Sequence, residues 1–307
     1  MIDPRRLSVR LMVTLGGLLL LLVFPFFFFT APDWGLFAFY PHIWGPGHIG
    51  FFFLLFLVIQ TRVPLPTWRH WLWASMAVMA LSVAIEAIQA QVGRNACWYD
   101  VLRNLIGTWL ALAWAQRPSL PIWGVRVVVS GLFLWQLMPL IGDVQLHRDT
   151  RRALPVLADF EQPLDRRQWR GELARVVSPV SVGESSLAVT LPAHVPYPGA
   201  VFDRVATDWR GYDALRFDIH NPQAEPLRVS IRIDDLAHDR RERGYADRFN
   251  RLLVAEPGWN HYRIPLSDIE QAPQERTLDL HRIQRIYWFT RRLDAPQRFY
   301  LDNIHLE

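Results

Sequence analysis

The sequence predicts a protein of two parts, a multi-pass α-helical membrane bundle with about five spans and an all-β domain of the jelly-roll or β-sandwich type. Long apolar runs are confined to residues 1–148, and period-two alternation of apolar and polar residues begins at Phe160. The charges divide in the same way, with ten basic and five acidic residues in 1–148 against 23 and 24 in 149–307. The basic excess therefore belongs to the first half. Because no basic stripe accompanies it, it does not indicate a nucleic-acid-binding protein.

Five apolar runs are the expected membrane spans, at residues 11–29, 48–60, 70–90, 101–116 and 127–141. A helix needs about 20 apolar residues to cross a bilayer core, so the run 48–60 is short, and the topology depends on its crossing. The first run follows three arginines and ends in FPFFFFTAPDWG without a small-residue cleavage site. We therefore expect an uncleaved span rather than a signal peptide.

The arginines of the first half predict how the spans are oriented. Segments on one side of the five spans hold Arg5, Arg6, Arg10, Arg62, Arg69, Arg117 and Arg126. The segments between spans on the other side hold only Arg94. The positive-inside rule then places the N-terminus in the cytoplasm and residues 149–307 outside the cytoplasmic (inner) membrane, as an extracytoplasmic or periplasmic domain.

Residues 82–107, SVAIEAIQAQVGRNACWYDVLRNLIG, concentrate polar groups in and between two expected spans. Groups three or four positions apart share a helix face, and charged groups at membrane depth cost about 2.5–3.5 kcal/mol each on insertion scales. We therefore predict a polar membrane pocket near the outer leaflet. Its residues are His48, Ser82, Glu86, Gln89, Arg94, Asp100, Asn104 and Gly107. Such a set could bind a phosphate, transfer a proton or coordinate a cation, or it could consist of salt bridges and hydrogen bonds between helices.

This pattern resembles the VanZ-like family of small membrane proteins, over about residues 8–140. The resemblance rests on a His at the start of a span (His48), on LSVAIEAIQ and on R-x5-D-x3-N-x2-G, which begins at Arg94. The segment NACWY, with the single cysteine Cys97, departs from the family pattern. The resemblance implies a link to glycopeptide-antibiotic resistance, and it brings no agreed chemistry.

Residues 149–158 are expected to be a linker, and residues 159–307 a single β domain. Six runs alternate with period two and are separated by turn signals such as HNPQ and EPGW. They are SLAVTL, ALRFDIH, LRVSIRIDD, HYRIPL, RIYWF and FYLDNIHL. This number and spacing of strands indicates a β-sandwich.

The β domain resembles carbohydrate-binding modules and galactose-binding-like jelly rolls. The resemblance rests on FEQPLDRRQW near its start, EPGWNHYRIPLSDI, and LDNIHLE at its end. It implies a structural calcium between the two ends of the domain, with Glu161 and Asp302 at the matching positions. Carboxylate oxygens suit such a hard cation, although Glu161 could equally cap a turn and Asp302 end a strand.

A polar segment within residues 235–250 is the expected sugar-binding region, because sugars need planar polar groups and an aromatic face. Its candidate residues are Asp235, His238, Tyr245, Asp247, Arg248 and Asn250. The alternative is a network of these side chains that satisfies itself. Further aromatic platforms are Trp209, Tyr212, Trp259 and Trp288, of which Trp259 and Trp288 lie on strand-like runs and are expected to be buried in the core.

These observations favour a non-catalytic envelope protein over an enzyme. The outer β domain would bind a glycan or a glycan-bearing partner, and the membrane pocket a lipid-linked glycan or an antibiotic-related ligand. The alternative is a membrane enzyme that acts on a lipid phosphate or polyprenyl carrier, with Glu86, His48 and Asp100 as acid–base groups. A third is a scaffolding subunit that docks envelope proteins. The sequence lacks a nucleophile motif, a Walker loop, a dinucleotide fingerprint and a zinc motif.

Overall fold

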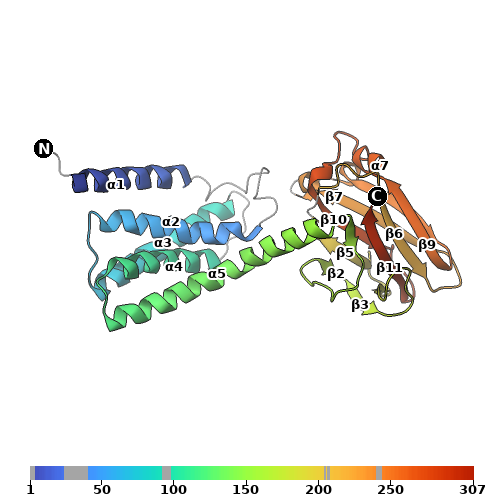
Figure 1. Cartoon of the computed structure of the whole chain (residues 1–307), viewed down its shortest axis with the longest axis horizontal. Coiled ribbons are helices and arrows are strands. Elements are labelled where there is room, and N and C mark those ends of the chain that lie inside the picture. Colours follow the sequence, from blue (N-terminus) through green and yellow to red (C-terminus); the bar gives the residue numbers. More distant parts are fainter. Residues whose placement is uncertain (1–3, 24–40, 92–97, 204, 206–207, 240–243) are drawn as a thin grey trace. The chain divides into compact units, whose positions relative to one another are not determined.

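The computed structural model describes residues 4–23, 41–91, 98–203, 205, 208–239 and 244–307 (Figure 1). The chain forms two compact units, Met1–Gln145 and Leu146–Glu307. The first unit is helical and the second is built of β-strands.

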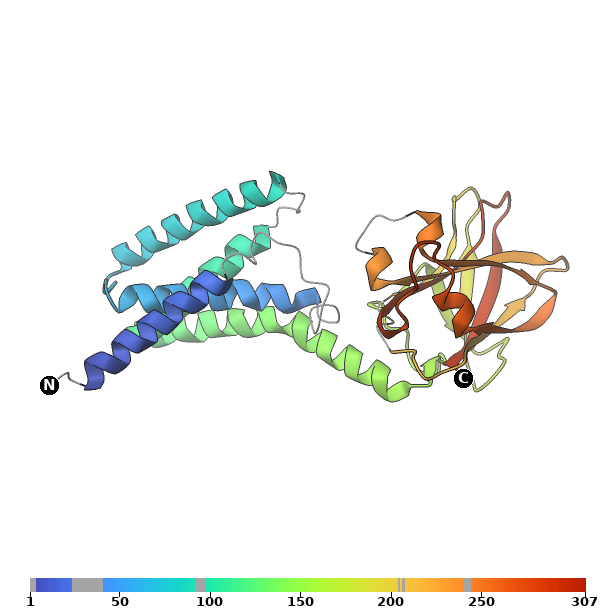
Figure 2. The ribbon, with the colours of Figure 1, turned by 90° about the horizontal axis from the view of Figure 1, so that it is seen from above.

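The helical unit is organised around α4. Its helices are α1 (Pro4–Val23), α2 (Trp44–Gln60, preceded by the 3-10 turn η3 at Pro41–Ile43), α3 (Trp68–Gln91), α4 (Trp98–Ala115) and α5 (Leu120–Ala153). Helix α4 packs against both α2 and α3 (Figure 2). It approaches α2 so closely that a Cβ on Gly107 would lie 2.3 Å from the carbonyl oxygen of Ile49. Phe52 and Leu112 are fully buried in this contact region.

Arg126 of α5 closes the C-terminal end of α4. Its guanidinium donates to the carbonyls of Ala113 (3.1 Å) and Gln116 (2.8 Å), and it lies over the rings of Trp114 and Trp123. Carbonyls at a helix end lack partners within the helix, and a cation stabilises that end. The sequence suggested a loop arginine at this position, but Arg126 is buried and caps a helix.

Two of the described helices are long and apolar enough to cross a membrane, at Trp68–Ile88 and Leu120–Ala153. Val13–Val23 and Trp44–Gln60 are apolar but shorter. The structure therefore shows a helical region with two candidate spans, and the multi-pass membrane bundle of about five spans remains a prediction. Large apolar side chains such as Leu21, Trp73 and Val127 face outward on these helices, whereas Ser82 and Asn104 are buried among them.

The expected linker at 149–158 is not a linker in the structure. Helix α5 continues beyond the predicted end of the fifth span to Ala153, and Val156–Ala158 forms strand β1, which pairs with β11. The fifth span was predicted to end at residue 141, shortly before the charged residues that begin at Asp143. A helix can continue into polar sequence, however, because its backbone hydrogen bonds do not depend on apolar side chains.

The second unit is a β-sandwich with jelly-roll-like long-range pairing (Figures 1 and 2). One sheet has the order β3-β4-β11-β6-β9, with β1 also paired to β11, and the other has the order β2-β5-β10-β7-β8. The first sheet consists of β1, β3 (Glu172–Val176), β4 (Ser186–Leu191), β6 (Ala214–Asn221), β9 (Gly258–Pro265) and β11 (Gln297–Leu306). The second consists of β2 (Trp169–Arg170), β5 (Gly199–Asp203), β7 (Leu227–Asp235), β8 (Phe249–Ala255) and β10 (Ile283–Phe289). The turns include α6 (Leu236–Asp239), η4 (Tyr245–Asp247), α7 (Leu266–Glu270) and η5 (Leu280–Arg282).

Apolar side chains from both sheets fill the space between them. Trp169 stacks on Phe202 at 4.5 Å between ring centroids, and Trp209 and Trp288 are fully buried. Two of the suggested sugar platforms, Trp209 and Trp288, are thus core residues. Tyr212 packs against this core as well. The expectation that Trp259 is buried in the core is wrong, because its position in β9 turns it to the outer side of its sheet. There it is only half-buried, and its ring meets that of His220.

Because side chains alternate along a strand, each sheet also has an outer face. We call the outer face of the β2-β5-β10-β7-β8 sheet the β10 face, and that of the other sheet the β6 face. On the β10 face, Val201, Tyr287, Arg232 and Asn250 follow one another across four strands in a single row of paired residues.

Candidate functional sites

A hydrogen-bonded chain of buried side chains joins three helices of the helical unit. The ring Nδ1 of His48 on α2 meets Oδ1 of Asn104 on α4 at 3.0 Å. The amide Nδ2 of Asn104 donates to Oγ of Ser82 on α3 at 2.8 Å. All three side chains are buried. Each is therefore satisfied by a neighbouring helix, which is the arrangement that polar groups require among apolar helices.

Charged groups lie next to this chain. Asp100 accepts from Nη1 of Arg103 at 2.6 Å, and its other oxygen is 3.7 Å from Nε2 of His48. Arg103 also donates through Nε to Oε1 of Gln136 on α5 at 3.1 Å. Glu86 of α3 is buried and interacts electrostatically with the His48 ring.

The structure thus gathers six of the eight predicted pocket residues, His48, Ser82, Glu86, Asp100, Asn104 and Gly107. The side chain of Gln89 and residue Arg94 lie outside the described residues. Sequence reasoning left two participants out of the pocket, Arg103 and Gln136. It also did not select the buried Asp143 of α5. Asp143 accepts from the ring Nδ1 of His42 at 2.7 Å and from its backbone N–H. A polar residue within a span is the signal that could have identified Gln136.

In the β domain, Asp235 and Asp247 are held by a single arginine that is distant in the sequence. Arg276 donates to Oδ1 of Asp247 at 2.7 Å and to Oδ1 of Asp235 at 2.8 Å. His238 donates its backbone N–H to Asp235 and places its ring Nδ1 3.1 Å from Asp247. Burial lowers the pKa of Arg276, but its hydrogen bonds to the two aspartates outweigh burial and keep the pKa above its ordinary value. Asp235, His238 and Asp247 therefore form a network that satisfies itself, one of the two expected alternatives.

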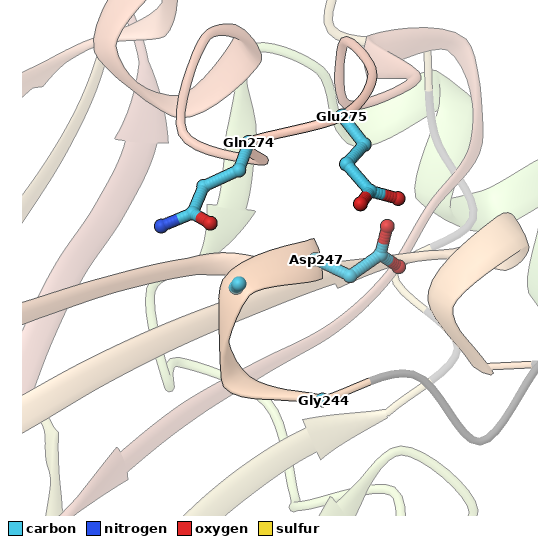
Figure 3. Close-up of a pocket in the computed structure, with 5 residues that line it drawn as sticks. Gly244, Asp247, Gln274 and Glu275 are labelled. Carbon is cyan, nitrogen blue, oxygen red and sulfur yellow. The ribbon is translucent and has the colours of Figure 1, made fainter.

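A pocket of about 240 Å³ lies beside this network. It is lined by Gly244, Ala246, Asp247, Gln274 and Glu275. Figure 3 shows the carboxylates of Asp247 and Glu275 pointing toward one another across the pocket. Because Arg276 and His238 already contact the oxygens of Asp247, the exposed side chains of Gln274 and Glu275 are the more available polar groups.

The β10 face carries a row of aromatic rings that sequence reasoning did not select. Tyr197 is 69% exposed and meets Phe289 edge-on at 5.8 Å, and Tyr287 lies two positions before Phe289 on the same strand face. The guanidinium of Arg232 covers the Tyr287 ring at 4.5 Å. The alternation in RIYWF was the available signal, because it turns Tyr287 and Phe289 away from the buried Trp288.

The other predicted sugar-binding residues border this face. Tyr245 is exposed, with the guanidinium of Arg248 5.6 Å from its ring centroid. Asn250 follows in β8, opposite Arg232. Burial, followed by the charge of Arg232, lowers the pKa of Arg248. The structure thus separates the predicted set into a buried network and a bordering group of Tyr245, Arg248 and Asn250.

The two positions proposed for calcium are occupied by hydrogen-bond donors. Oδ2 of Asp302 accepts from the backbone N–H groups of Ser181 (2.7 Å) and Val182 (3.1 Å), and Oδ1 accepts from that of Asn303 (2.7 Å). Oε1 of Glu161 accepts from the N–H groups of Glu184 and Ser185. These donors direct positive hydrogens at the oxygens that a cation would need, so this donor set fits an anchored loop and does not fit a calcium site. Among the described residues, no cluster of three or more His, Cys, Asp or Glu side chains could hold a metal ion.

Comparison with known families shows that the β domain is similar to carbohydrate-binding modules. A family model described as carbohydrate binding domain 30 matches residues 182–307. The match does not extend to residues 8–140, whose resemblance to the VanZ-like family stays a prediction. No curated protein matches the chain.

Several solved structures are similar to the β domain. A family 11 carbohydrate-binding module from Clostridium thermocellum, solved with a β-1,3-1,4-mixed-linked tetrasaccharide, is 20% identical, with a TM-score of 0.38, 50% of this chain covered and 94% of that one. A family 30 module of a cellulosomal cellulase of Clostridium thermocellum is 15% identical, with a TM-score of 0.34 and coverages of 50% and 92%. An exo-β-agarase is 16% identical, with a TM-score of 0.39 and coverages of 50% and 24%.

Proposed function

We propose that this protein is a membrane-anchored envelope protein whose β domain binds a glycan across the β10 face. The outward-facing aromatic row of the exposed Tyr197 and the half-buried Phe289 and Tyr287 carries this proposal. A sugar ring offers an apolar face of C–H groups and a rim of hydroxyls, which aromatic rings and planar polar groups complement. Arg232 and Asn250 lie beside the row and supply such polar groups. The family-model match to residues 182–307 supports the same function.

The helical unit serves as the membrane anchor in this proposal. The core helices of a soluble protein are mostly buried. In the apolar stretches of the two helices that are long enough to span a membrane, by contrast, only 22% and 17% of the residues are buried. Apolar side chains on their surface and buried polar side chains between them suit a lipid environment. We extend this to five spans, a cytoplasmic N-terminus and an extracytoplasmic β domain, which the arginine distribution supports.

Binding of the full chain, purified in a neutral detergent, to an immobilised glycan panel tests the proposal. Tyr287→Ala and Phe289→Ala should each weaken binding about tenfold, since each removes a ring from the contact surface. Trp259→Ala is the matched control, because it removes a half-buried aromatic from the β6 face. Equal losses in all three variants, or no binding to any glycan, would reject the β10 face as the site.

A second candidate function is an acid–base enzyme of the membrane that acts on a lipid phosphate or polyprenyl carrier. It is favoured by the position of Glu86, Asp100 and Arg103 around the buried His48. In this mechanism His48 or Glu86 would transfer a proton, while a cation bound the phosphate. Full function of the Glu86→Gln protein in cells would exclude it. In the non-catalytic alternative, the same pocket binds the lipid end of a lipid-linked glycan, or the protein docks an envelope partner.

A further inference from the structure

Arginines outnumber acidic residues on the β10 face. We count the described residues that point outward from its strands, together with Arg248, which adjoins β8. Two of these residues are aspartates, Asp203 and Asp234. Five are arginines, namely Arg170, Arg228, Arg232, Arg248 and Arg285. A concentration of one sign of charge beside a binding surface raises the local concentration of ligands with the opposite sign.

The two aspartates are already engaged. Asp203 is shared by Arg170 (2.8 Å) and Arg285 (2.9 Å) from the two neighbouring strands. Asp234 accepts from Arg232 through both of its oxygens. Both carboxylates are therefore already bonded to other arginines of this face.

Among the described residues, no carboxylate pairs with two of these five arginines, the exposed Arg228 and the half-buried Arg248. Of the two, only Arg248 has a buried nitrogen without a hydrogen-bond partner, its Nε. Its one described side-chain contact is with the ring of Tyr245. Leaving a buried donor unsatisfied costs about 1–3 kcal/mol, and more for a charged group, so such groups usually have a partner.

We propose that the glycan recognised at the β10 face is acidic, and that Arg248 binds its carboxylate or sulfate group. This inference rests on the proposed function and specifies its ligand class. A guanidinium suits both anions because its planar fork can donate two parallel hydrogen bonds. Burial, and after it the positive charge of Arg232, lowers the pKa of Arg248, while the charge of Asp234 acts in the opposite direction. A bound anion would offset the charge of Arg232.

The β6 face provides a contrast within the same domain. There Arg216 and Arg263 both bond to Glu307 (2.8 and 2.7 Å), and Asp218 and Asp302 add negative charge. The positive excess is thus a property of one face and not of the whole domain.

Matched saccharides that differ only in charge test this inference on the full chain. The probes are uronate oligosaccharides with their carboxyl-reduced forms, sulfated galactan oligosaccharides with their desulfated forms, and a neutral mixed-linked β-glucan. We expect at least one acidic form to bind about tenfold or more tightly than its neutral counterpart, with a preference that weakens at high salt. The two pairs distinguish a carboxylate ligand from a sulfate ligand.

Arg248→Gln should remove most of this preference, whereas Arg216→Gln on the β6 face should leave it unchanged. Arg248→Lys keeps the positive charge but loses the planar guanidinium, so it should retain part of the preference for acidic saccharides. It also serves as the test if the Arg248→Gln protein does not fold. Equal or tighter binding of every neutral form would overturn the inference while leaving glycan binding intact. An unchanged preference in Arg248→Gln would overturn the role of Arg248, and absence of binding to all saccharides would reject the proposed function as well.

Discussion

Arg276 stabilises the β domain by joining three segments that are far apart in the sequence. One guanidinium bonds to Asp235 at the end of β7 and to Asp247 in η4. The backbone N–H of Asp279 adds a bond to Asp235. A planar side chain with five donors can satisfy two carboxylates at once, which lysine cannot do.

We predict that Arg276→Ala destabilises the β domain by about 3 kcal/mol. Removing one partner of a buried ion pair leaves the other charge uncompensated, and the usual cost is about 3–5 kcal/mol. For a domain of this size the thermal midpoint should fall by roughly 6–12 °C. Near-ultraviolet circular dichroism of the full chain would measure it. The control is Arg167→Ala, which removes the solvent-exposed ion pair between Arg167 and Asp165. It should shift the midpoint by no more than about 3 °C.

At this scale, the sequence predicted the members of the network but could not decide their role. Asp235, His238 and Asp247 lie close together in the chain, so a polar cluster was expected. Whether they bind a sugar or each other depends on Arg276, which follows Asp247 by 29 positions. Only the fold brings it into reach. For Tyr287 and Phe289 the local pattern was sufficient. Their strand was predicted, and its alternation indicates that both residues face outward, but they were not selected as site residues.

At the scale of elements, strong alternation was sufficient to predict strands, and short or irregular strands were missed. The six expected runs all form strands in the structure. Strand β5 was missed because GAVFD is short and follows a proline, and β8 because FNRLLVA does not alternate regularly. Both strands are defined by their partners β10 and β7, and such long-range pairing is not visible in a local pattern.

Tyr262 links the two sheets at an open edge of the sandwich. Its hydroxyl on β9 donates to the carbonyl of Val254 on β8 at 2.8 Å, and burial raises its pKa to about 12. Below pH 10 the folded and unfolded states both keep this proton. Between about pH 10 and 12 only the unfolded state loses it, so the stability of the domain should fall as pH rises through this window.

Tyr262→Phe should therefore lower stability by about 1 kcal/mol at neutral pH, the usual net contribution of one hydrogen bond. It should also make the loss of stability above pH 10 less steep than in the unaltered protein. Thermal midpoints of both proteins from pH 8 to 11 would measure this. An identical alkaline slope in the two proteins would contradict the assignment to Tyr262.

The contact between α2 and α4 depends on a glycine, which gives a second prediction for elements. Gly107→Ala would place a methyl group 2.3 Å from the carbonyl oxygen of Ile49, so the helices must separate. We expect lower thermal stability of the helical unit in detergent. Gly50→Ala on α2 is the control, because nothing lies within 4 Å of its added Cβ. Its greater helix propensity should leave stability unchanged or raise it by up to about 1 kcal/mol.

At the scale of the whole molecule, the division into two units follows from a change in the period of the apolar pattern. The helical unit presents apolar surface and encloses its polar groups, whereas the β unit encloses its apolar groups. The boundary itself was predicted less well, since α5 continues across the expected linker. The proposed function requires the β domain to lie on the extracytoplasmic side of the membrane. The single cysteine of the sequence offers a direct test of this orientation.

We predict that Cys97 reacts with a membrane-impermeant maleimide from the extracytoplasmic side. It is the only cysteine of the chain, and it falls between the third and fourth expected spans. With a cytoplasmic N-terminus, that segment is outside, on the same side as the β domain. Labelling in right-side-out and inside-out membrane vesicles would measure it. In the Cys97→Ser background, Ser119→Cys lies between α4 and α5 and should be labelled only in inside-out vesicles. The reverse pattern would place the β domain in the cytoplasm, away from any extracellular glycan.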